Sequence, residues 1–191
     1  CDRNRNGGGV ACYVRNDLCF NRKTLFSDET EFIFFDILIP KVKGISIGIC
    51  YRPPWQGAFF DILIREFQNS AEFENNELYI LGDLNVNLFY NDSYILKENL
   101  SCKHKNLITP LINKYKEFCQ SFLLKQIIRV PTRITCHSSS LLDHILTNSV
   151  EKIATSGVID VGVSDHQLIF FTRKIVRFKA NAHKKALVRC F

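Results

Sequence analysis

The sequence predicts an α/β fold: a four-layer sandwich in which helices cover the outer faces of two mixed β-sheets. Strand-like apolar runs come in groups that are separated by single amphipathic segments of helical periodicity, which is the element order of that architecture. The chain has 191 residues, of which 46% are hydrophobic, so it is long enough to bury one sizeable core. Sixteen Phe and no Met indicate that phenylalanine rings fill that core.

Three strands are expected in the first third of the chain. The glycines at 7–9 are a turn signal, and the apolar residues at 10–14 that follow them predict a strand. Residues 30–39 and 44–51 predict two more strands with a hairpin connection between them. The proline pair at 53–54 ends the third strand, because proline has no N–H for the ladder.

The middle of the chain alternates helices with a strand. Apolar residues three and four positions apart predict amphipathic helices over 59–73 and 107–124. Between them, residues 77–81 predict a short apolar strand, and a polar loop rich in Asn follows over 85–105. The last third returns to strands, which are expected at 127–130, 141–147, 158–163 and 167–171.

The positive charge of the chain is concentrated at its end. The net charge is +6, yet the segment from Arg173 onward contains seven bases and no acid, so the rest is nearly neutral. A basic tail suits an acidic partner such as nucleic acid. A solvated linker to a further segment explains the same composition equally well. We therefore expect a domain over 1–172 and a basic tail or linker over 173–191.

The cysteines and the apolar runs indicate an intracellular protein. The eight cysteines form no C-x-x-C pair and repeat no zinc-binding spacing, and several stand inside apolar runs. Free thiols of this kind fit a reducing compartment better than secretion. No signal peptide is visible, and the longest apolar run, 32–39, is interrupted by Asp36 and is too short to span a bilayer.

Two polar residues after the 77–81 strand are the first candidates for chemistry. Asp83 and Asn85 are two positions apart, so in an extended chain their side chains point to one side. The carboxylate can orient or deprotonate a water, and the amide can donate to a developing negative charge. Taken alone, the pair is more typical of an ordinary Gly-Asp turn.

The second candidates are Asp165 and His166, which precede the last predicted strand. A histidine in this position can act as a general acid or as a phosphate-binding cation, and it needs a second carboxylate to fix its tautomer. Asp143 is the candidate carboxylate, because a charge inside an apolar strand is usually paired. Taken alone, Asp165 and His166 are more typical of a capping acid and a surface histidine. The other histidines, which we interpret as structural or solvated, are His104, His137, His144 and His183.

The order of these segments is more specific than any one of them. The segments are Gly7-Gly8-Gly9-Val10-Ala11, Cys50-Tyr51-Arg52-Pro53-Pro54, Gly82-Asp83-Leu84-Asn85, Pro131-Thr132-Arg133, Leu142-Asp143-His144-Ile145-Leu146-Thr147-Asn148 and Ser164-Asp165-His166. As a set they resemble the endonuclease/exonuclease/phosphatase superfamily, whose DNase I-like fold is the sandwich described above. The resemblance is strongest to the endonuclease domain of non-LTR, jockey-like retrotransposon polyproteins.

The resemblance implies hydrolysis of a phosphodiester by in-line attack of water. Asp83 would orient or activate the water, and Asn85 would hold a phosphate oxygen. His166, oriented by Asp143, would stabilise the pentacovalent phosphorus, and Tyr51 would donate to the phosphate. Phosphoryl transfer requires alignment and charge neutralisation more than covalent chemistry, so these roles are physically reasonable.

The resemblance also implies a divalent metal, Mg²⁺ or in its place Mn²⁺, which Asp165 would support. In the family an Asn and the principal metal-binding Glu precede the glycine run, and residues 1–6 contain neither; Glu29 and Glu31 follow the run. The sequence is therefore expected to lack two N-terminal strands, to bind metal weakly, and to have little or no nuclease activity on its own.

DNA is the substrate that the resemblance implies, with nicking of target DNA that primes reverse transcription. The segment 131–141 stands in the place of the family's target-reading hairpin, where Arg133 and Thr132 would contact phosphates; Arg52 is a weaker candidate. Ordinary turn residues are an equally good interpretation of all three. A reverse transcriptase domain would follow in the polyprotein, and action on chromosomal DNA would require a nuclear location.

Two alternatives remain open at the level of sequence. The fold could serve a small phosphoester such as a phosphoinositide, although the basic tail and the segments around Thr132 and Asp143 argue against this. The chain could also be a non-catalytic relic or a domesticated fragment that only binds nucleic acid or a protein, which the missing Glu supports.

Overall fold

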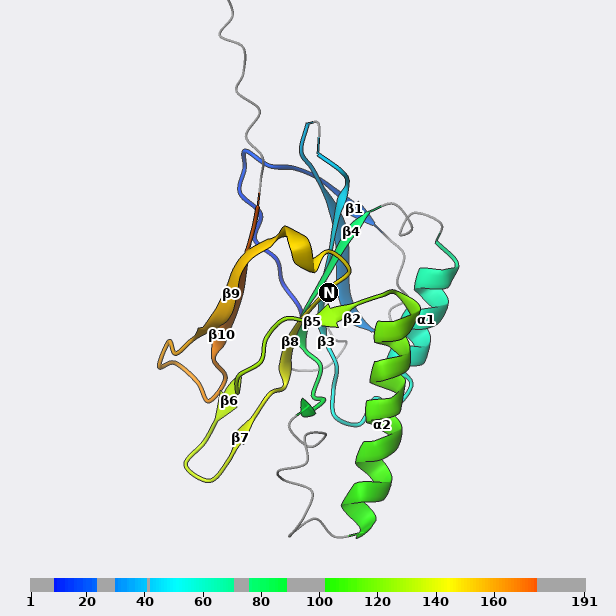
Figure 1. Cartoon of the computed structure of the whole chain (residues 1–191), viewed down its shortest axis with the longest axis vertical. Coiled ribbons are helices and arrows are strands. Elements are labelled where there is room, and N and C mark those ends of the chain that lie inside the picture. Colours follow the sequence, from blue (N-terminus) through cyan, green and yellow to red (C-terminus); the bar gives the residue numbers. More distant parts are fainter. Residues whose placement is uncertain (1–8, 24–29, 41, 71–75, 89–101, 175–191) are drawn as a thin grey trace, which may run out of the picture.

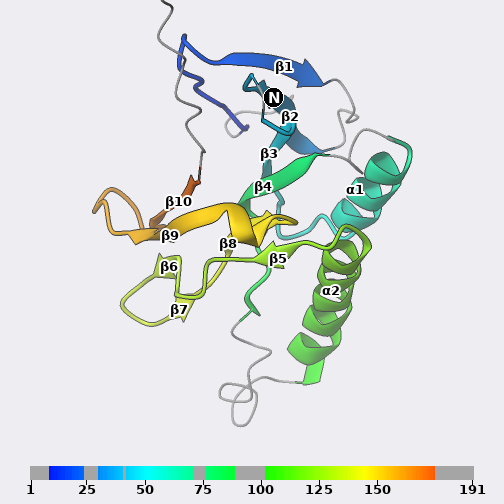
Figure 2. The ribbon, with the colours of Figure 1, turned by 45° about the horizontal axis from the view of Figure 1, so that its top comes forward.

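The computed structural model of the chain describes residues 9–23, 30–40, 42–70, 76–88 and 102–174, and these form three stacked layers (Figure 1). Two helices cover one face of a six-stranded sheet, and a two-stranded ribbon covers part of the opposite face (Figure 2). The predicted α/β class and the mixed main sheet are confirmed. The second sheet is, within the described residues, an antiparallel pair and not a mixed sheet.

The six-stranded sheet has the order β1-β2-β3-β4-β8-β5. All neighbours are antiparallel except β3 and β4, which are parallel and are connected through α1. The carboxyl ends of β3 and β4 therefore lie beside the amino end of β8. The strands are β1 (Cys19–Lys23), β2 (Glu31–Leu38), β3 (Ile45–Tyr51), β4 (Glu77–Asp83), β8 (Asp143–Thr147) and β5 (Lys125–Gln126).

The helical layer consists of α1 (Phe59–Gln68) and α2 (Cys102–Ser121). Every second residue of β4 faces these helices, and Leu78 and Ile80 are each 1% exposed. The core between the layers is rich in phenylalanine, as predicted. Its rings pack mostly edge-to-face or tilted, at centroid distances that favour aromatic pairs. The phenylalanines of this core are Phe32, Phe34, Phe59, Phe60, Phe67, Phe118 and Phe122.

The second layer is the antiparallel ribbon of β9 (Ile153–Ile159) and β10 (Leu168–Arg173). Its apolar residues pack on Leu81 and Ile145 of the main sheet, and the ring of Phe171 stacks on Tyr79 at a centroid distance of 4.9 Å. This packing leaves the β9–β10 connection at the edge of the sheet where β4 ends.

Arg173 corrects the predicted start of the tail. Its guanidinium forms two hydrogen bonds, each 2.7 Å long, with the carboxylate of Glu77, which is buried. Arg173 is the last residue of β10 and belongs to the folded domain, because a buried bidentate pair with β4 anchors it there. The residues of the predicted tail from 175 onward lie outside the described part of the chain.

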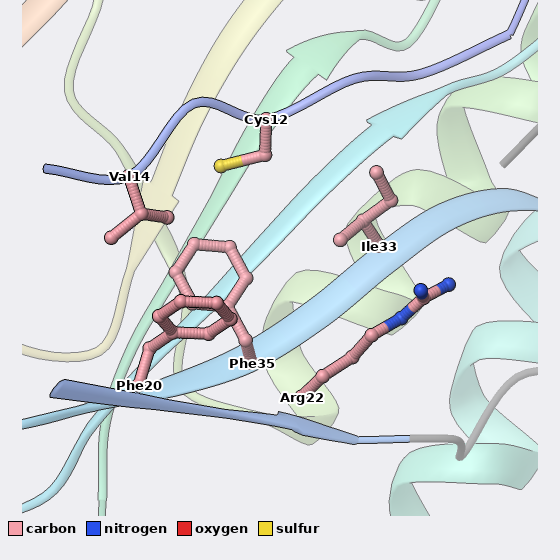
Figure 3. A pocket seen from close by; sticks show the side chains of 6 residues that line it. All are labelled: Cys12, Val14, Phe20, Arg22, Ile33 and Phe35. Atoms are coloured by element: carbon pink, nitrogen blue, oxygen red, sulfur yellow. The ribbon is translucent and has the colours of Figure 1, made fainter. Parts of the chain in front are cut away.

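Residues 10–14 are extended but belong to no strand in the described structure, so the strand expected there is wrong. Two of their side chains, Cys12 and Val14, instead lie against the sheet at β1, an edge strand that the sequence analysis did not predict. Figure 3 shows the contact: Cys12 and Val14 lie over the edge-to-face pair of Phe20 and Phe35, around a cavity of about 270 Å³. Alternation of side chains thus predicted a face that is partly covered, and here it is covered without strand pairing.

Other element boundaries shifted. The strand expected at 127–130 is replaced by the short β5 just before it, and the one expected at 158–163 is β9, which begins at Ile153. The short hairpin β6 (Arg133–Ile134) and β7 (Ser139–Ser140) lies within the predicted DNA-reading segment, and a 3-10 turn covers Val150–Lys152. Most of the polar loop, residues 89–101, is outside the described residues.

Two further expectations can be compared with the described residues. Cys12, Cys19, Cys50, Cys119 and Cys136 are free thiols. Neither described helix is long and apolar enough to cross a membrane.

Candidate active site

Three of the predicted site residues stand in one row across the main sheet. Tyr51 at the end of β3 is in register with Asp83 at the end of β4, and Asp83 is in register with Asp143 at the start of β8. Residues in register on adjacent strands project to the same face of a sheet. Leu81 and Ile145 lie two residues further along the same strands, and therefore on the same face. They pack against the β9–β10 ribbon, so the row faces that ribbon as well.

His166 reaches the row from the β9–β10 connection. Its Nδ1 lies 2.9 Å from Oδ2 of Asp143, so an Nδ1–H donates to the carboxylate. The histidine side chain is 33% exposed and the aspartate side chain is 14% exposed. The contact expected between Asp143 and His166 is therefore present, and it leaves Nε2 for a substrate.

Main-chain hydrogen bonds from the hairpin β6–β7 hold the backbone on both sides of His166. Arg133 and His166 form an isolated antiparallel bridge, in which Gln167 N donates to Thr132 O at 2.7 Å and Ile134 N donates to Asp165 O at 2.9 Å. The main chain around His166 is thus tied to the hairpin as well as to β8.

Asp83 and Asn85 form a tight turn instead of an extended pair. Asn85 has a left-handed backbone, with φ 49°, and its N–H donates to Oδ1 of Asp83 at 2.9 Å. Its side-chain amide donates to Oδ2 of Asp83 at 3.2 Å and to the carbonyl of Arg52 at 2.9 Å. The expectation that both side chains point side by side from an extended strand is therefore wrong. The amide must release Asp83 to reach a phosphate oxygen.

Gly82 makes this turn possible. Its φ is +145°, and a Cβ at this position would lie 1.8 Å from the carbonyl oxygen of Cys50. Only glycine fits where β4 comes this close to β3. The glycine of the Gly-Asp segment is thus explained by backbone approach, and it sets the direction in which Asp83 leaves the sheet.

The electrostatics of the row favour a cation. Burial is the main cause that raises the pKa of Asp83, and the nearby charge of Asp143 raises it further; the N–H of Asn85 and the charges of His166 and Arg52 act against this. Ligand atoms of Asp83, Asp143 and His166 all lie within 4.8 Å of one another, the one such group found among the described residues. Two carboxylates that repel each other at an accessible edge are the donor chemistry of a hydrated divalent ion, which needs few protein ligands.

Asp165 lies outside this group. Its carboxylate accepts a 2.7 Å hydrogen bond from Nε of Arg133, and this bond is the main cause that lowers its pKa. Both side chains are more than 40% exposed, at 43% and 44%. The roles expected of them, metal support for Asp165 and phosphate contact for Arg133, would each require this pair to open.

Thr132 and Arg52, both expected to contact DNA, are buried. Thr132 is 0% exposed, and its hydroxyl oxygen accepts hydrogen bonds from the N–H groups of Leu142 and Asp143, at 3.0 Å and 2.9 Å. Arg52 is 1% exposed and donates to main-chain carbonyls. Neither side chain is available to a phosphate in this structure, so both residues support the site from within.

Two residues around the row were given no site role by the sequence analysis. His144 is buried, and it was interpreted as structural or solvated; its Nε2–H donates to Val86 O at 2.9 Å while Nδ1 accepts from the hydroxyl of Tyr115 at 3.1 Å. Glu31 is in register with Tyr51 and extends the row by one strand.

The sequence and the architecture match one protein family. The profile of the endonuclease/exonuclease/phosphatase family matches residues 1–166, so the chain belongs to this family. The family comprises nucleases and phosphatases, which places the chemistry in the class of phosphoester hydrolysis. No curated protein matches the sequence.

Solved structures show the same fold. The endonuclease domain of TRAS1, a telomere-specific non-LTR retrotransposon, is similar with a TM-score of 0.57 and 17% identity, over 82% of this chain and 68% of that one. An endonuclease/exonuclease/phosphatase family protein from Leptotrichia buccalis C-1013-b is similar with a TM-score of 0.53 and 13% identity, over 82% and 61%. At these identities the likeness concerns the fold.

Proposed function

We propose that the chain is a Mg²⁺-dependent DNA endonuclease of the retrotransposon type, which cuts one strand of a target duplex. The observation that carries the proposal is the hydrogen-bonded couple of His166 and Asp143 beside the partly buried carboxylate of Asp83. A base, an oriented imidazole and a cluster of metal-ligand atoms at one edge of a sheet suit phosphodiester hydrolysis.

Each residue has a definite task in this proposal. Asp83 accepts a proton from, or orients, the attacking water, and its raised pKa makes it a better base than an exposed aspartate. Asp143 holds the Nδ1–H tautomer of His166, so that Nε2 faces the phosphate oxygens and stabilises their charge. Tyr51, next in the row, is in place to donate to the phosphate.

A divalent metal fits the same edge. The carboxylates of Asp83 and Asp143 would hold it, with water completing its coordination. Bound there, Mg²⁺ supplies neutralisation of the charge on the phosphate.

Three observations support DNA as the substrate. TRAS1, with the same fold, is the endonuclease of a retrotransposon by its description. The hairpin β6–β7 stands directly beside His166, with Arg133 and Ile134 exposed on it or partly so. The six bases from Lys174 onward add positive charge. A reverse transcriptase domain in the same polyprotein and action in the nucleus belong to this proposal.

The test is nicking of supercoiled plasmid by the 1–191 chain. The proposed activity requires conversion to open circles with Mg²⁺, no conversion with EDTA, and none in Asp83→Ala or His166→Ala. Asp160→Asn is the matched control, since Asp160 lies in the same β9–β10 connection and its carboxylate only accepts from the N–H of Gly162. Such nicking would overturn the expectation that this chain alone is inactive.

Other outcomes decide between the alternatives. DNA binding without any nicking would overturn the endonuclease proposal and favour a non-catalytic nucleic-acid-binding fragment. Release of phosphate from soluble inositol phosphates, with no effect on plasmid, would favour the small-molecule phosphoesterase.

A further inference from the structure

Arg52 is the largest side chain among the described residues that is less than 2% exposed. It follows Tyr51 directly and lies beneath the row of site residues. Its guanidinium connects two segments that are more than 25 residues apart in the chain. On one side Nε donates to Leu84 O at 2.6 Å and Nη2 donates to Asn85 O at 2.9 Å. On the other side Nη1 donates to Pro53 O and Gln56 O, each at 3.1 Å, and to Pro54 O at 3.4 Å.

The cation therefore bonds to carbonyl dipoles and not to a carboxylate. Burying a charge is costly unless hydrogen bonds and nearby charges compensate it. Desolvation lowers the pKa of Arg52, while the charge of Asp83 acts in the opposite direction. The desolvation of this guanidinium is unfavourable, and the hydrogen bonds that it donates to the two segments offset it.

What Arg52 holds is the Asp83–Asn85 turn. Its own N–H donates to Asp83 O at 2.9 Å, and its carbonyl accepts from the side-chain amide of Asn85 at 2.9 Å. Nη2 of Arg52 also donates to Asn85 O, so Arg52 forms hydrogen bonds with both the side chain and the main chain of Asn85. Asn85 is also one of two described non-glycine residues with a positive φ, a conformation that persists only where the surroundings enforce it.

We infer that Arg52 is a positioning residue: its buried guanidinium holds the Asp83–Asn85 turn so that the carboxylate of Asp83 keeps the geometry that hydrolysis requires. The inference rests on the proposed function for its catalytic consequence. Lysine cannot replace arginine here, because a compact ammonium with three donors cannot reach carbonyls on two separate segments.

The experiment compares Arg52→Lys with Arg173→Lys. Arg173 is the matched control, because it is also a largely buried arginine with a main-sheet partner, but its partner Glu77 is at the other end of β4, away from the site. Both variants remove a buried guanidinium. Only the first removes it from the turn.

Two readouts are expected to separate the variants. In hydrogen exchange, the amides of residues 83–86 should lose protection in Arg52→Lys and keep it in Arg173→Lys. In plasmid nicking, Arg52→Lys should lower kcat by about 100-fold, the effect of misplacing catalytic groups by about 1 Å, with KM for DNA within about threefold of the parent. Arg173→Lys should keep the parent kcat at a temperature where both variants are folded.

Equal kcat values in the two variants, or unchanged exchange at 83–86 in Arg52→Lys, would overturn the inference. If Arg52→Lys does not fold, Arg52→Gln carries the same comparison, since it leaves no buried charge. If the parent chain does not nick DNA, the proposed function fails while the exchange measurement still decides whether Arg52 holds the turn.

Discussion

The imidazole of His166 and the carboxylate of Asp143 are joined by a 2.9 Å hydrogen bond that connects the two sheets of the molecule. Asp143 begins β8 in the main sheet, whereas His166 lies two residues before β10 of the β9–β10 ribbon. The bond engages Nδ1, so the nitrogen left for a substrate is Nε2. Several predictions depend on how this couple is held and what surrounds it.

Asp143→Asn should remove the charge that holds the histidine tautomer and leave the fold unchanged. We expect kcat for plasmid nicking to fall by about 10²- to 10⁴-fold, the usual contribution of an oriented acid–base group, with little change in DNA affinity. The circular dichroism spectrum should match that of the parent. A kcat within threefold of the parent would show that His166 does not depend on Asp143.

Thr132→Val should destabilise the domain, because it leaves the buried N–H groups of Leu142 and Asp143 without an acceptor. The free energy of unfolding in urea should drop by about 2–6 kcal/mol, at about 1–3 kcal/mol for each of the two unsatisfied groups. Thr135→Val is the control: its hydroxyl also accepts from two N–H groups, of His137 and Ser138, but water can replace it at the hairpin surface. Equal losses in both variants would contradict the explanation by burial.

Arg133→Ala should weaken DNA binding with little effect on stability. Its pair with Asp165 is exposed, so its loss should change the free energy of unfolding by less than about 1 kcal/mol. If Arg133 contacts a phosphate, the salt dependence of DNA affinity should decrease by about one unit of log K per log [salt]. Arg15→Ala removes another exposed arginine paired with an aspartate, away from the site, and should leave this slope unchanged.

His144 should make the domain sensitive to acid. Burial is the main cause that lowers its pKa, from an ordinary value of 6.5 to about 4, so the folded state holds it neutral. The stability that depends on the neutral form is complete above pH 6.5 and is lost as the pH falls from 6.5 toward 4. Between pH 7.5 and pH 5 the loss should be about 2 kcal/mol.

Urea unfolding of the parent and of His144→Gln at these two pH values checks this. Glutamine does not titrate, so the variant should lose about 2 kcal/mol less than the parent over the same interval. The same pH dependence in both proteins would show that another group is responsible.

Much of the main sheet could be predicted from local pattern. The strands at 31–38, 45–51 and 77–83 and the helix that begins at Phe59 follow from apolar periodicity and from the prolines at 53 and 54. The pattern failed at residues 10–14, where apolar side chains cover the sheet without strand pairing, and at β1, which is mostly exposed. Periodicity reports which side chains are buried, and it does not report how the backbone pairs.

The sequence predicted which residues form the site, but not which of the neighbouring residues are buried. Tyr51, Asp83, Asp143 and His166 were chosen from the sequence, and the structure brings them to one edge. The sequence did not show that Thr132 and Arg52 are buried, since a threonine or an arginine beside a proline is typical of an exposed turn. Their burial depends on carbonyl and N–H groups that come from distant segments.

The sequence by itself determined most strands of the main sheet, the two helices, the family and the residues at the strand ends, because periodicity and motif order are local properties of the chain. The tertiary structure decided which of those residues meet. Strand register placed Tyr51, Asp83 and Asp143 in a row, and packing of the second layer brought His166 to Asp143. It also turned Arg52 inward, because the carbonyls that satisfy a buried guanidinium are supplied jointly by the segments after β3 and β4.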